Sequence, residues 1–340
     1  MIGNNFEIGS EFWDVPVCET ENYIIPSNTE WFVSGRSALK AIIKDIKTEI
    51  TFNSAALPSW CCDSMIIPFL EEGINVEFYP VYLENGKLKK DFTGVFDCDA
   101  ILIMDYFGYK RQTNLDFDGI VIRDITHSVF CNYDIIADYT FGSFRKWAGF
   151  YTGGFAFKKN GFLKSESRQI NSDYVELRRK AMQKKNDYIN RKNKNKDFLN
   201  DFACAEEMLE EFDVMSGCAE DVFRAKRLDI DFIKQRRRKN AQVLLDELSD
   251  LAIFPELAED DCPLFVPLVI PNSRRDELRQ YLITKQIYCP IHWPLTNHHK
   301  TDDKSMEIYQ KGISIVCDQR YDENDMRRIC FEIKSFLNLR

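Results

Sequence analysis

Short apolar runs alternate with amphipathic stretches along the first half of the chain. Helical spacing predicts helices at 37–46 and 64–73, the second of them closed by Gly73. Runs rich in Val, Ile, Phe and Tyr predict strands, at 49–57, 75–81, 100–108, 119–127, 137–144 and 153–159. Strands that alternate with helices are typical of an α/β domain with a mainly parallel sheet. The last run, GGFAFKK, predicts a strand that returns into that sheet.

The second half of the chain has a different pattern. From 199 to 251 the periodicity is helical, and 228–251 predicts one long helix that leads out of the large domain. Beyond it, the pattern predicts strand, helix, strand and terminal helix, at 265–271, 274–286, 287–293 and 323–337. We therefore expect a large α/β domain over 1–235 and a small α+β domain over 236–340.

The composition is that of an ordinary soluble protein. The 340 residues are 44% hydrophobic and 29% charged, and no run approaches the roughly 18 apolar residues that a membrane span needs. The opening residues, MIGNNFEIGSEFWD, lack the basic and apolar regions of a signal peptide. A net charge of −9 argues against a nucleic-acid partner. We expect a cytoplasmic protein that binds neither nucleic acid nor membrane.

Metal and disulfide chemistry find little support in the sequence. The eleven cysteines are scattered and form no CxxC pair, which favours reduced, mostly buried thiols. His298 and His299, near Asp302 and Asp303, hint at a metal site, but a solvated polar loop explains them better. The basic run 178–196 has the charge to attract an anionic substrate or a lipid, yet a solvated helix or a mobile loop is the simpler interpretation.

The segment SFRKWAGFYTGG places a lysine, Lys146, between two predicted strands. A lysine among aromatic residues is usually a surface residue whose stem lies over apolar neighbours. Covalent lysine chemistry instead needs a partly desolvated amine with a lowered pKa. The surroundings of Lys146 are suited to both effects, with Phe144, Trp147 and Phe150 nearby and Arg145 as a cationic neighbour.

The segment IVIRDITHSVF places Asp124 at the carboxyl end of an apolar strand. An aspartate there is commonly a helix N-cap or a turn residue. It is also the usual partner of the pyridine nitrogen of pyridoxal phosphate (PLP), which must stay protonated to act as an electron sink. His127, three residues on, is either a hydrogen-bonded core histidine or a contact of the same ring.

A phosphate-binding turn is predicted in WFVSGRSALKAII. Ser34, Gly35, Arg36 and Ser37 open a helix there, and backbone N–H groups at a helix start bind phosphate. Any helix capped by Ser-Gly has the same pattern, so the turn alone is weak evidence for a phosphate site. It supports such a site only together with Lys146 and Asp124. Ser143 is a candidate for a further phosphate ligand.

With these segments in order, the chain resembles the DegT-type sugar aminotransferase family of the fold type I PLP-dependent enzymes. The matching segments are SGRSALKAI, LPSWCCDSMIIPF, MDYFG, RDITHSV, ADYTFGSFRKW with the following TGG, and CPIHWPL, from about residue 34 to 295. The resemblance implies the PLP-dependent transferase fold, with a mainly parallel mixed sheet between helices in the large domain and a smaller C-terminal α+β domain.

The resemblance also implies a role for each of the residues singled out above. Lys146 would hold PLP as a Schiff base, Asp124 would bind the pyridine nitrogen, and His127 would contact the ring oxygen. The phosphate would lie on Arg36, Ser37 and Ser143 in the turn that Ser34 and Gly35 begin. Either Trp60 or the nearby Cys62 would cover the face of the cofactor.

The activity implied is transfer of an amino group from glutamate to the keto group of a nucleotide-linked sugar. Members of the family are usually homodimers whose active sites lie at the subunit boundary. This chain departs from the family in three places: Ser143 stands only three residues before Lys146, RKW surrounds the lysine, and PLT follows the His-Trp pair. These departures leave the cofactor assignment standing and weaken the assignment of the substrate.

Two other functions remain open at this point. A dehydratase or lyase acting on sugars could use the same cofactor, although a dehydratase of this kind often has histidine in place of the lysine. A non-catalytic binding protein could keep the fold alone. The group that binds the carboxylate of the amino donor is also open, with Arg36, Arg145 and Arg320 as candidates.

Overall fold

The computed structural model describes residues 7–95, 97–109, 115–131, 137–164, 166, 168–169 and 172–339. Residues 1–6, part of the segment that lacks signal-peptide features, lie outside this range. Among the described residues, no helix is long and apolar enough to cross a membrane, and no group of His, Cys, Asp and Glu side chains is arranged to hold a metal ion.

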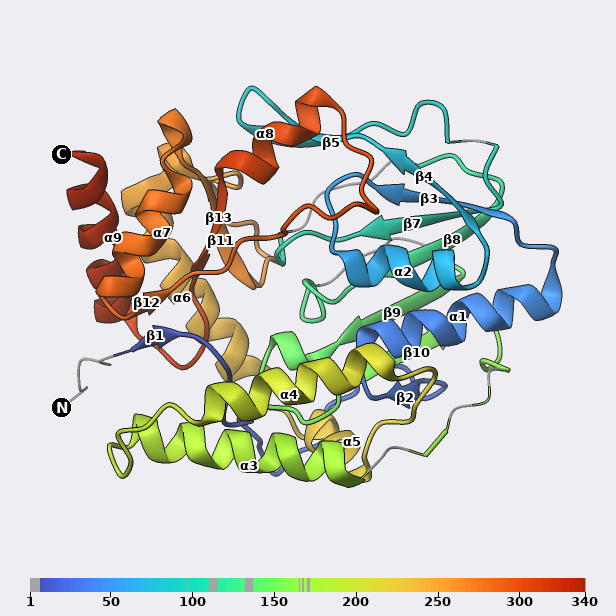
Figure 1. Cartoon of the computed structure of the whole chain (residues 1–340), viewed down its shortest axis with the longest axis horizontal. Helices are drawn as coiled ribbons and strands as arrows, with labels where there is room; N and C mark the ends of the chain where they lie inside the picture. The colour runs from blue at the N-terminus through green and yellow to red at the C-terminus, as the bar shows by residue number, and fades with distance from the viewer. Residues whose placement is uncertain are drawn as a thin grey trace.

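A seven-stranded sheet in the order β2-β10-β9-β8-β7-β3-β4 forms the centre of the N-terminal part of the chain (Figure 1). Five strands run parallel: β3 (Ser54–Pro58), β4 (Asn75–Tyr79), β7 (Ala100–Met104), β8 (Ile120–Asp124) and β9 (Tyr139–Ser143). At one edge, β10 (Gly154–Lys158) runs antiparallel to both of its neighbours, β9 and β2 (Glu30–Phe32), so β2 again has the direction of the parallel strands. This arrangement confirms the predicted α/β class, including the returning strand.

Helices pack on the sheet through their apolar faces. Figure 1 shows α1 (Gly35–Glu49) and α2 (Asp63–Glu71) in front of the sheet, and α3 (Ser172–Ile189) and α4 (Phe198–Glu211) side by side below it, with α5 (Ala219–Lys226) behind them. The spacing of Ala38, Ile42 and Ile46, all buried, gives α1 its sheet-facing stripe.

The basic run 178–196 is less solvated than its composition predicts. Its first part lies in α3, where Arg178 and Lys185 are buried. Lys185 forms an ion pair with buried Glu7, and Lys196 bonds the other oxygen of the same carboxylate at 2.7 Å. These contacts tie the N-terminal segment to α3 and explain why the Lys185 ammonium can be withdrawn from solvent.

The C-terminal part has its own core. The long helix α6 (Ile230–Leu248) is followed by η2 (Ser249–Leu251), β11 (Phe265–Val269), η3 (Pro271–Ser273), α7 (Arg275–Thr284), β12 (Ile287–Tyr288), α8 (Asp303–Lys311), β13 (Gly312–Val316) and α9 (Glu323–Leu337). Strands β11 and β13 pair antiparallel, and α6, α7 and α9 pack beside them (Figure 1).

Two features bear on where one domain ends and the next begins. The expected boundary at 235 falls inside α6, so this helix belongs to both parts. The N-terminal strand β1 (Ile8–Gly9) pairs with β12, and Ile8 is buried in the C-terminal core. The division into 1–235 and 236–340 stays a prediction.

Candidate active site

Polar residues from several elements gather at the carboxyl ends of the parallel strands. β8 ends at Asp124, β9 ends at Ser143, and α1 begins after Ser34. These ends face one cavity of about 260 Å³, as expected for a ligand site in an open α/β sheet. Its lining includes Ser34, Gly35, Arg36, Cys62, Asp124, Thr126, His127, Ser143, Arg145, Lys146, Glu206 and Trp293.

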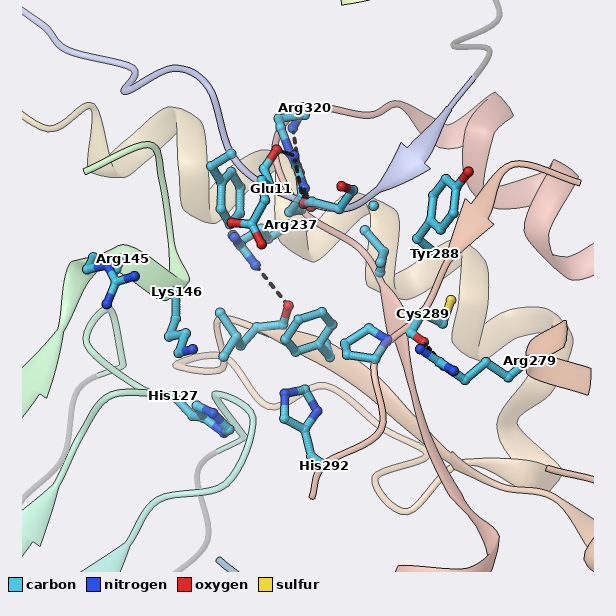
Figure 2. A pocket seen from close by; sticks show the side chains of 18 of the residues that line it. Glu11, His127, Arg145, Lys146, Arg237, Arg279, Tyr288, Cys289, His292 and Arg320 are labelled. Carbon is cyan, nitrogen blue, oxygen red and sulfur yellow. Dashed lines mark hydrogen bonds and ion pairs between the residues drawn. The ribbon is translucent and has the colours of Figure 1, made fainter. Parts of the chain in front are cut away.

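Lys146 enters this cavity from the short helix η1 (Phe144–Lys146), which follows β9 directly. Its side chain is exposed there, and Figure 2 shows its amine pointing toward His127 and His292. The neighbouring aromatic residues do something other than crowd the amine. Phe144, Trp147 and Phe150 are buried in a core cluster beneath the turn, so they fix the turn and do not line the cavity.

Asp124 is buried, with 4% of its surface exposed. Burial raises the pKa of its carboxyl to about 6, against hydrogen bonds from Thr126 and the charge of Lys146, which lower it. Its Oδ1 accepts the backbone N–H of Thr126 at 2.7 Å. The carboxyl is therefore only partly compensated and suited to a cationic N–H from a ligand.

His127 is buried between the two halves of the site. Its imidazole is 5.6 Å from the indole of Trp293 in a stacked arrangement, and its Nδ1 is buried without a hydrogen-bond partner. Burial, then the nearby His292 and Lys146, hold the pKa of His127 well below its ordinary value. Burial and Lys146 likewise lower the pKa of His292 to about 3. Both rings are neutral at physiological pH.

The turn predicted to bind phosphate is present, but only three of its four residues line the cavity. Ser34 caps α1 by accepting the N–H of Ser37 at 3.2 Å, and Ser34, Gly35 and Arg36 line the cavity. The Ser37 hydroxyl does not, because it donates to the carbonyl of Asp213 at 3.0 Å and accepts the N–H of Met215 at 2.8 Å. A hydroxyl engaged in this way on the far side of the helix is not placed to bind a ligand in the cavity.

Gly35 keeps space open at the start of α1. A Cβ at this position would lie 3.6 Å from the Cβ of Ser143 and 3.9 Å from the Oγ1 of Thr126. Gly154 serves a different purpose, since a Cβ added there would lie 2.1 Å from the carbonyl oxygen of Ser34. The absence of a side chain at Gly154 therefore lets β10 lie directly against the turn. Thr126 was missed from the sequence, although it stands two residues after Asp124.

Of the two candidates for covering the ligand, only one faces the cavity. Trp60 is 1% exposed, stacks on Tyr106 at 4.9 Å and donates its Nε1–H to the carbonyl of His292 at 2.8 Å. It does not line the cavity, whereas Cys62 does, with its Sγ 2.9 Å from the Oγ of Ser64. The aromatic wall is Trp293, which sequence reasoning quoted only within the segment CPIHWPL.

A second cavity of about 460 Å³ opens on the other side of Lys146 (Figure 2). The two cavities share His127, Arg145, Lys146 and Glu206. The remaining walls come from residues 9–12, from Arg178 on α3 and from the C-terminal part, including Arg237, Arg279, Tyr288, His292 and Arg320. Lys146 thus stands where a smaller and a larger compartment meet.

The three arginines considered for a carboxylate differ in their contacts. Arg36 lines the smaller cavity, and Arg145 lines both and forms an ion pair with Glu206. Arg320 makes two contacts of 2.8 Å with the carboxylate of Asp318 and also bonds the backbone carbonyls of Ser10 and Glu11. Arg320 is thereby largely committed to holding the N-terminal segment.

The histidines considered for a metal serve as structural contacts. The His298 Nδ1 is 2.8 Å from the Oδ1 of Asp63, and the His299 Nε2 is 3.1 Å from the carbonyl of Cys61. Asp302 caps α8 by accepting the N–H of Ser305. The loop after Trp293 is therefore bound to the start of α2.

Comparisons at two levels give different results. No protein-family model matches the chain, and no curated protein matches it in sequence. Solved structures do match. A DegT DnrJ EryC1 StrS aminotransferase from Brucella abortus aligns with a TM-score of 0.57 and 15% identity, over 91% of this chain and 85% of the other.

Two further matches are of the same kind. DesV from S. venezuelae has a TM-score of 0.60 and 15% identity, over 91% of this chain and 84% of its own. The putative sugar aminotransferase Spr1654 from Streptococcus pneumoniae, solved in its PLP form, has a TM-score of 0.63 and 12% identity, over 90% of this chain and 86% of its own. At such identities the matches establish the fold alone. The chain has the fold of the DegT-type sugar aminotransferases, which is the fold that the resemblance implied.

Proposed function

We propose that this protein is a PLP-dependent aminotransferase. It would transfer an amino group from glutamate to a keto group of a nucleotide-linked sugar, in the biosynthesis of cell-surface polysaccharide or a related sugar. The observation that carries the proposal is the convergence of Lys146, Asp124 and the start of α1 on one cavity. These are the three elements that PLP needs: an amine, a partner for its ring nitrogen and a phosphate site.

Three features of the cavity support a fit to PLP. The partly compensated carboxyl of Asp124 has the charge to accept a pyridinium N–H. The unpartnered Nδ1 of His127 can bond a ring substituent. The space above Gly35, bounded by Ser143 and Thr126, and the backbone N–H groups at the start of α1 suit a phosphate. Ser37 is left out of this set because its hydroxyl is bonded elsewhere.

Each residue then has a defined task. PLP, when bound, supplies an electron sink that stabilises negative charge on the substrate carbon attached to its amino group. Lys146 would hold the cofactor by its Nζ and, when free, would serve as the base that moves a proton at that substrate carbon. Asp124 would accept the ring N–H and so keep the ring nitrogen protonated. Trp293 and His127 wall the cavity and exclude water from it.

The larger cavity is where we place the substrate. It meets the smaller one at Lys146, so a molecule there can bring its amino or keto carbon to the amine. The solved structures support a sugar as the acceptor, since several of the matching proteins are sugar aminotransferases and one of them, DesI, was solved with its TDP-sugar product. We also propose a cytoplasmic homodimer in which the partner subunit completes each phosphate site.

The half-reaction with glutamate tests the proposal. Protein loaded with PLP is expected to convert glutamate into one equivalent of 2-oxoglutarate per site without any sugar present. Lys146→Ala should abolish this product, whereas Lys159→Ala, at an exposed lysine outside both cavities, should leave it unchanged. A lyase that does not transaminate would make no 2-oxoglutarate, and neither would a binding protein, so absence of the product would reject the proposal.

A further inference from the structure

One buried arginine and one partly buried arginine converge on one carboxylate oxygen beside Lys146. Arg145 lies on η1 and Arg178 on α3, and both approach the Oε1 of Glu206, on α4; the Arg178 Nη1 is 3.2 Å from it. The three side chains differ in exposure. Arg145 is 12% exposed and Arg178 5%, whereas Glu206 is 52% exposed. The cations are thus built into the protein, and the anion reaches them from its surface.

Arg178 is also held by contacts other than Glu206. Arg178 donates from Nη2 to the carbonyl of Phe150 at 3.3 Å, and its guanidinium lies 4.9 Å from the ring centre of Phe202. The Nε atoms of Arg145 and Arg178 are buried without hydrogen-bond partners. If Glu206 swung into solvent, Arg178 would keep its position, and donors would remain at the place the carboxylate had left.

The charge around these residues favours a second anion. Burial alone would raise the pKa of Glu206, but the guanidiniums of Arg145 and Arg178 keep that pKa below its ordinary value. Glu206 is therefore ionised. Among the described residues that line the larger cavity, five are arginines and three are carboxylates: Arg145, Arg178, Arg237, Arg279 and Arg320 against Glu11, Glu206 and Asp318. The cavity therefore has a surplus of positive charge in a protein whose net charge is −9.

From this geometry we propose that Arg145 and Arg178 bind an anionic group of a substrate, and that Glu206 occupies their site until that group displaces it. The inference rests on the proposed function, because the anion would lie in the same cavity as the amine of Lys146. Guanidinium pairs recognise carboxylate and phosphate oxygens alike. The group is either a carboxylate of the amino donor or a phosphate of the sugar carrier. When it replaces the carboxylate of Glu206, one anion takes the place of another beside the two arginines.

Binding of two unreactive probes to the PLP-loaded protein tests the site. Glutarate stands for the dicarboxylate and UDP for the phosphate, each titrated by calorimetry. For one of the two probes, Arg178→Gln should weaken binding at least tenfold, and Glu206→Gln should tighten it several-fold because the competing carboxylate is gone. Arg179→Gln is the matched control: Arg179 follows Arg178 on α3, lines neither cavity and is 44% exposed, so its replacement should change binding less than twofold.

The results that overturn the proposal are specific. They are unchanged binding of both probes in Arg178→Gln, no gain in Glu206→Gln, or an equal loss of binding in Arg179→Gln. The gain expected for Glu206→Gln keeps the test valid even if Arg178→Gln folds poorly. If Arg178→Gln lowered the affinity for PLP as much as for the probe, the arginines would bind the cofactor phosphate, which also contradicts the proposal.

Absorbance of the Schiff base, recorded before each titration, separates this inference from the proposed function. A protein that never develops that absorbance argues against PLP chemistry as a whole. Normal absorbance with the wrong pattern of probe binding removes only the arginine site.

Discussion

The imidazole of His127 lies nearly parallel to the indole of Trp293, with their planes inclined by 20°. His127 follows β8 of the central sheet, whereas Trp293 belongs to the C-terminal part, just beyond β12. The stack therefore joins the two parts of the protein at the cavity. One wall of the site, Trp293, is thus supplied by the C-terminal part and not by the central sheet.

Trp293→Ala should weaken the binding of PLP. Loss of an aromatic wall removes contacts worth about 0.5–1.5 kcal/mol beyond buried area, so the Kd should rise up to about tenfold. Titration of the protein with PLP, followed by absorbance, measures this. An unchanged Kd would mean that Trp293 does not face the cofactor.

Trp60→Phe provides the contrast. The change keeps a ring against Tyr106 but removes the hydrogen bond to the carbonyl of His292, which should lower the free energy of unfolding by about 1 kcal/mol. PLP affinity should stay within twofold of the parent protein. A larger loss of affinity than in Trp293→Ala would restore Trp60 as the residue that covers the cofactor.

The affinity for PLP should depend on pH through Asp124. Its pKa in the protein without ligand is about 6, raised by burial. Above pH 6 the carboxylate is ionised and can accept the ring N–H, while below pH 6 it takes up a proton and loses that ability. Affinity should fall up to about tenfold per pH unit below 6.

Asp124→Asn separates this effect from the titration of PLP itself. The variant should bind PLP weakly at pH 7.5, and any pH dependence that it retains belongs to the cofactor. Without ligand the sign reverses: a carboxyl with a raised pKa is destabilising when ionised, so the variant should need more urea to unfold at pH 7.5. Equal pH profiles for the two proteins would contradict the assigned pKa.

The two glycines at the phosphate turn should respond differently to alanine. In Gly154→Ala the new Cβ would meet the backbone of Ser34, so the free energy of unfolding should fall by about 3 kcal/mol. In Gly35→Ala the Cβ meets only ordinary contact distances, and stability should change by less than about 0.5 kcal/mol. PLP affinity should nevertheless fall in Gly35→Ala. Unaltered affinity there would show that the phosphate lies elsewhere.

Lys185→Ala tests the buried ion pair with Glu7. The substitution leaves the carboxylate of Glu7 buried with one cation fewer, which should cost about 3–5 kcal/mol of stability. Lys180→Ala, an exposed lysine on the same helix, should change stability by less than about 0.5 kcal/mol. Urea unfolding of both variants gives the comparison, and similar midpoints would mean that Lys185 is in effect solvated.

Local patterns predicted the parallel strands, α1, α2 and the long helix α6, because each has an apolar period of its own. They missed α8 and β13 in the C-terminal part. They also missed the hairpin of β5 (Val81–Glu84) and β6 (Lys87–Lys90), although Asn85-Gly86 between them is a turn signal, and both residues have positive φ.

Parts of the site depend on directions that a linear pattern does not contain. Successive residues of a helix point about 100° apart, so Ser37 faces Met215 although Arg36 faces the cavity. Trp60 and Cys62 are separated in the same way by the loop before α2. The meeting of Arg145 and Glu206 needs the packing of α4 over the turn, which only the tertiary structure provides.

The central claim is that Lys146 carries PLP, and covalent trapping tests it most directly. The loaded protein is reduced with borohydride, digested and mapped by mass spectrometry. The expected result is one phosphopyridoxyl group, on the peptide that contains Lys146, with no adduct in Lys146→Ala. An adduct on another lysine, or no adduct in a protein that has bound PLP, would contradict the account.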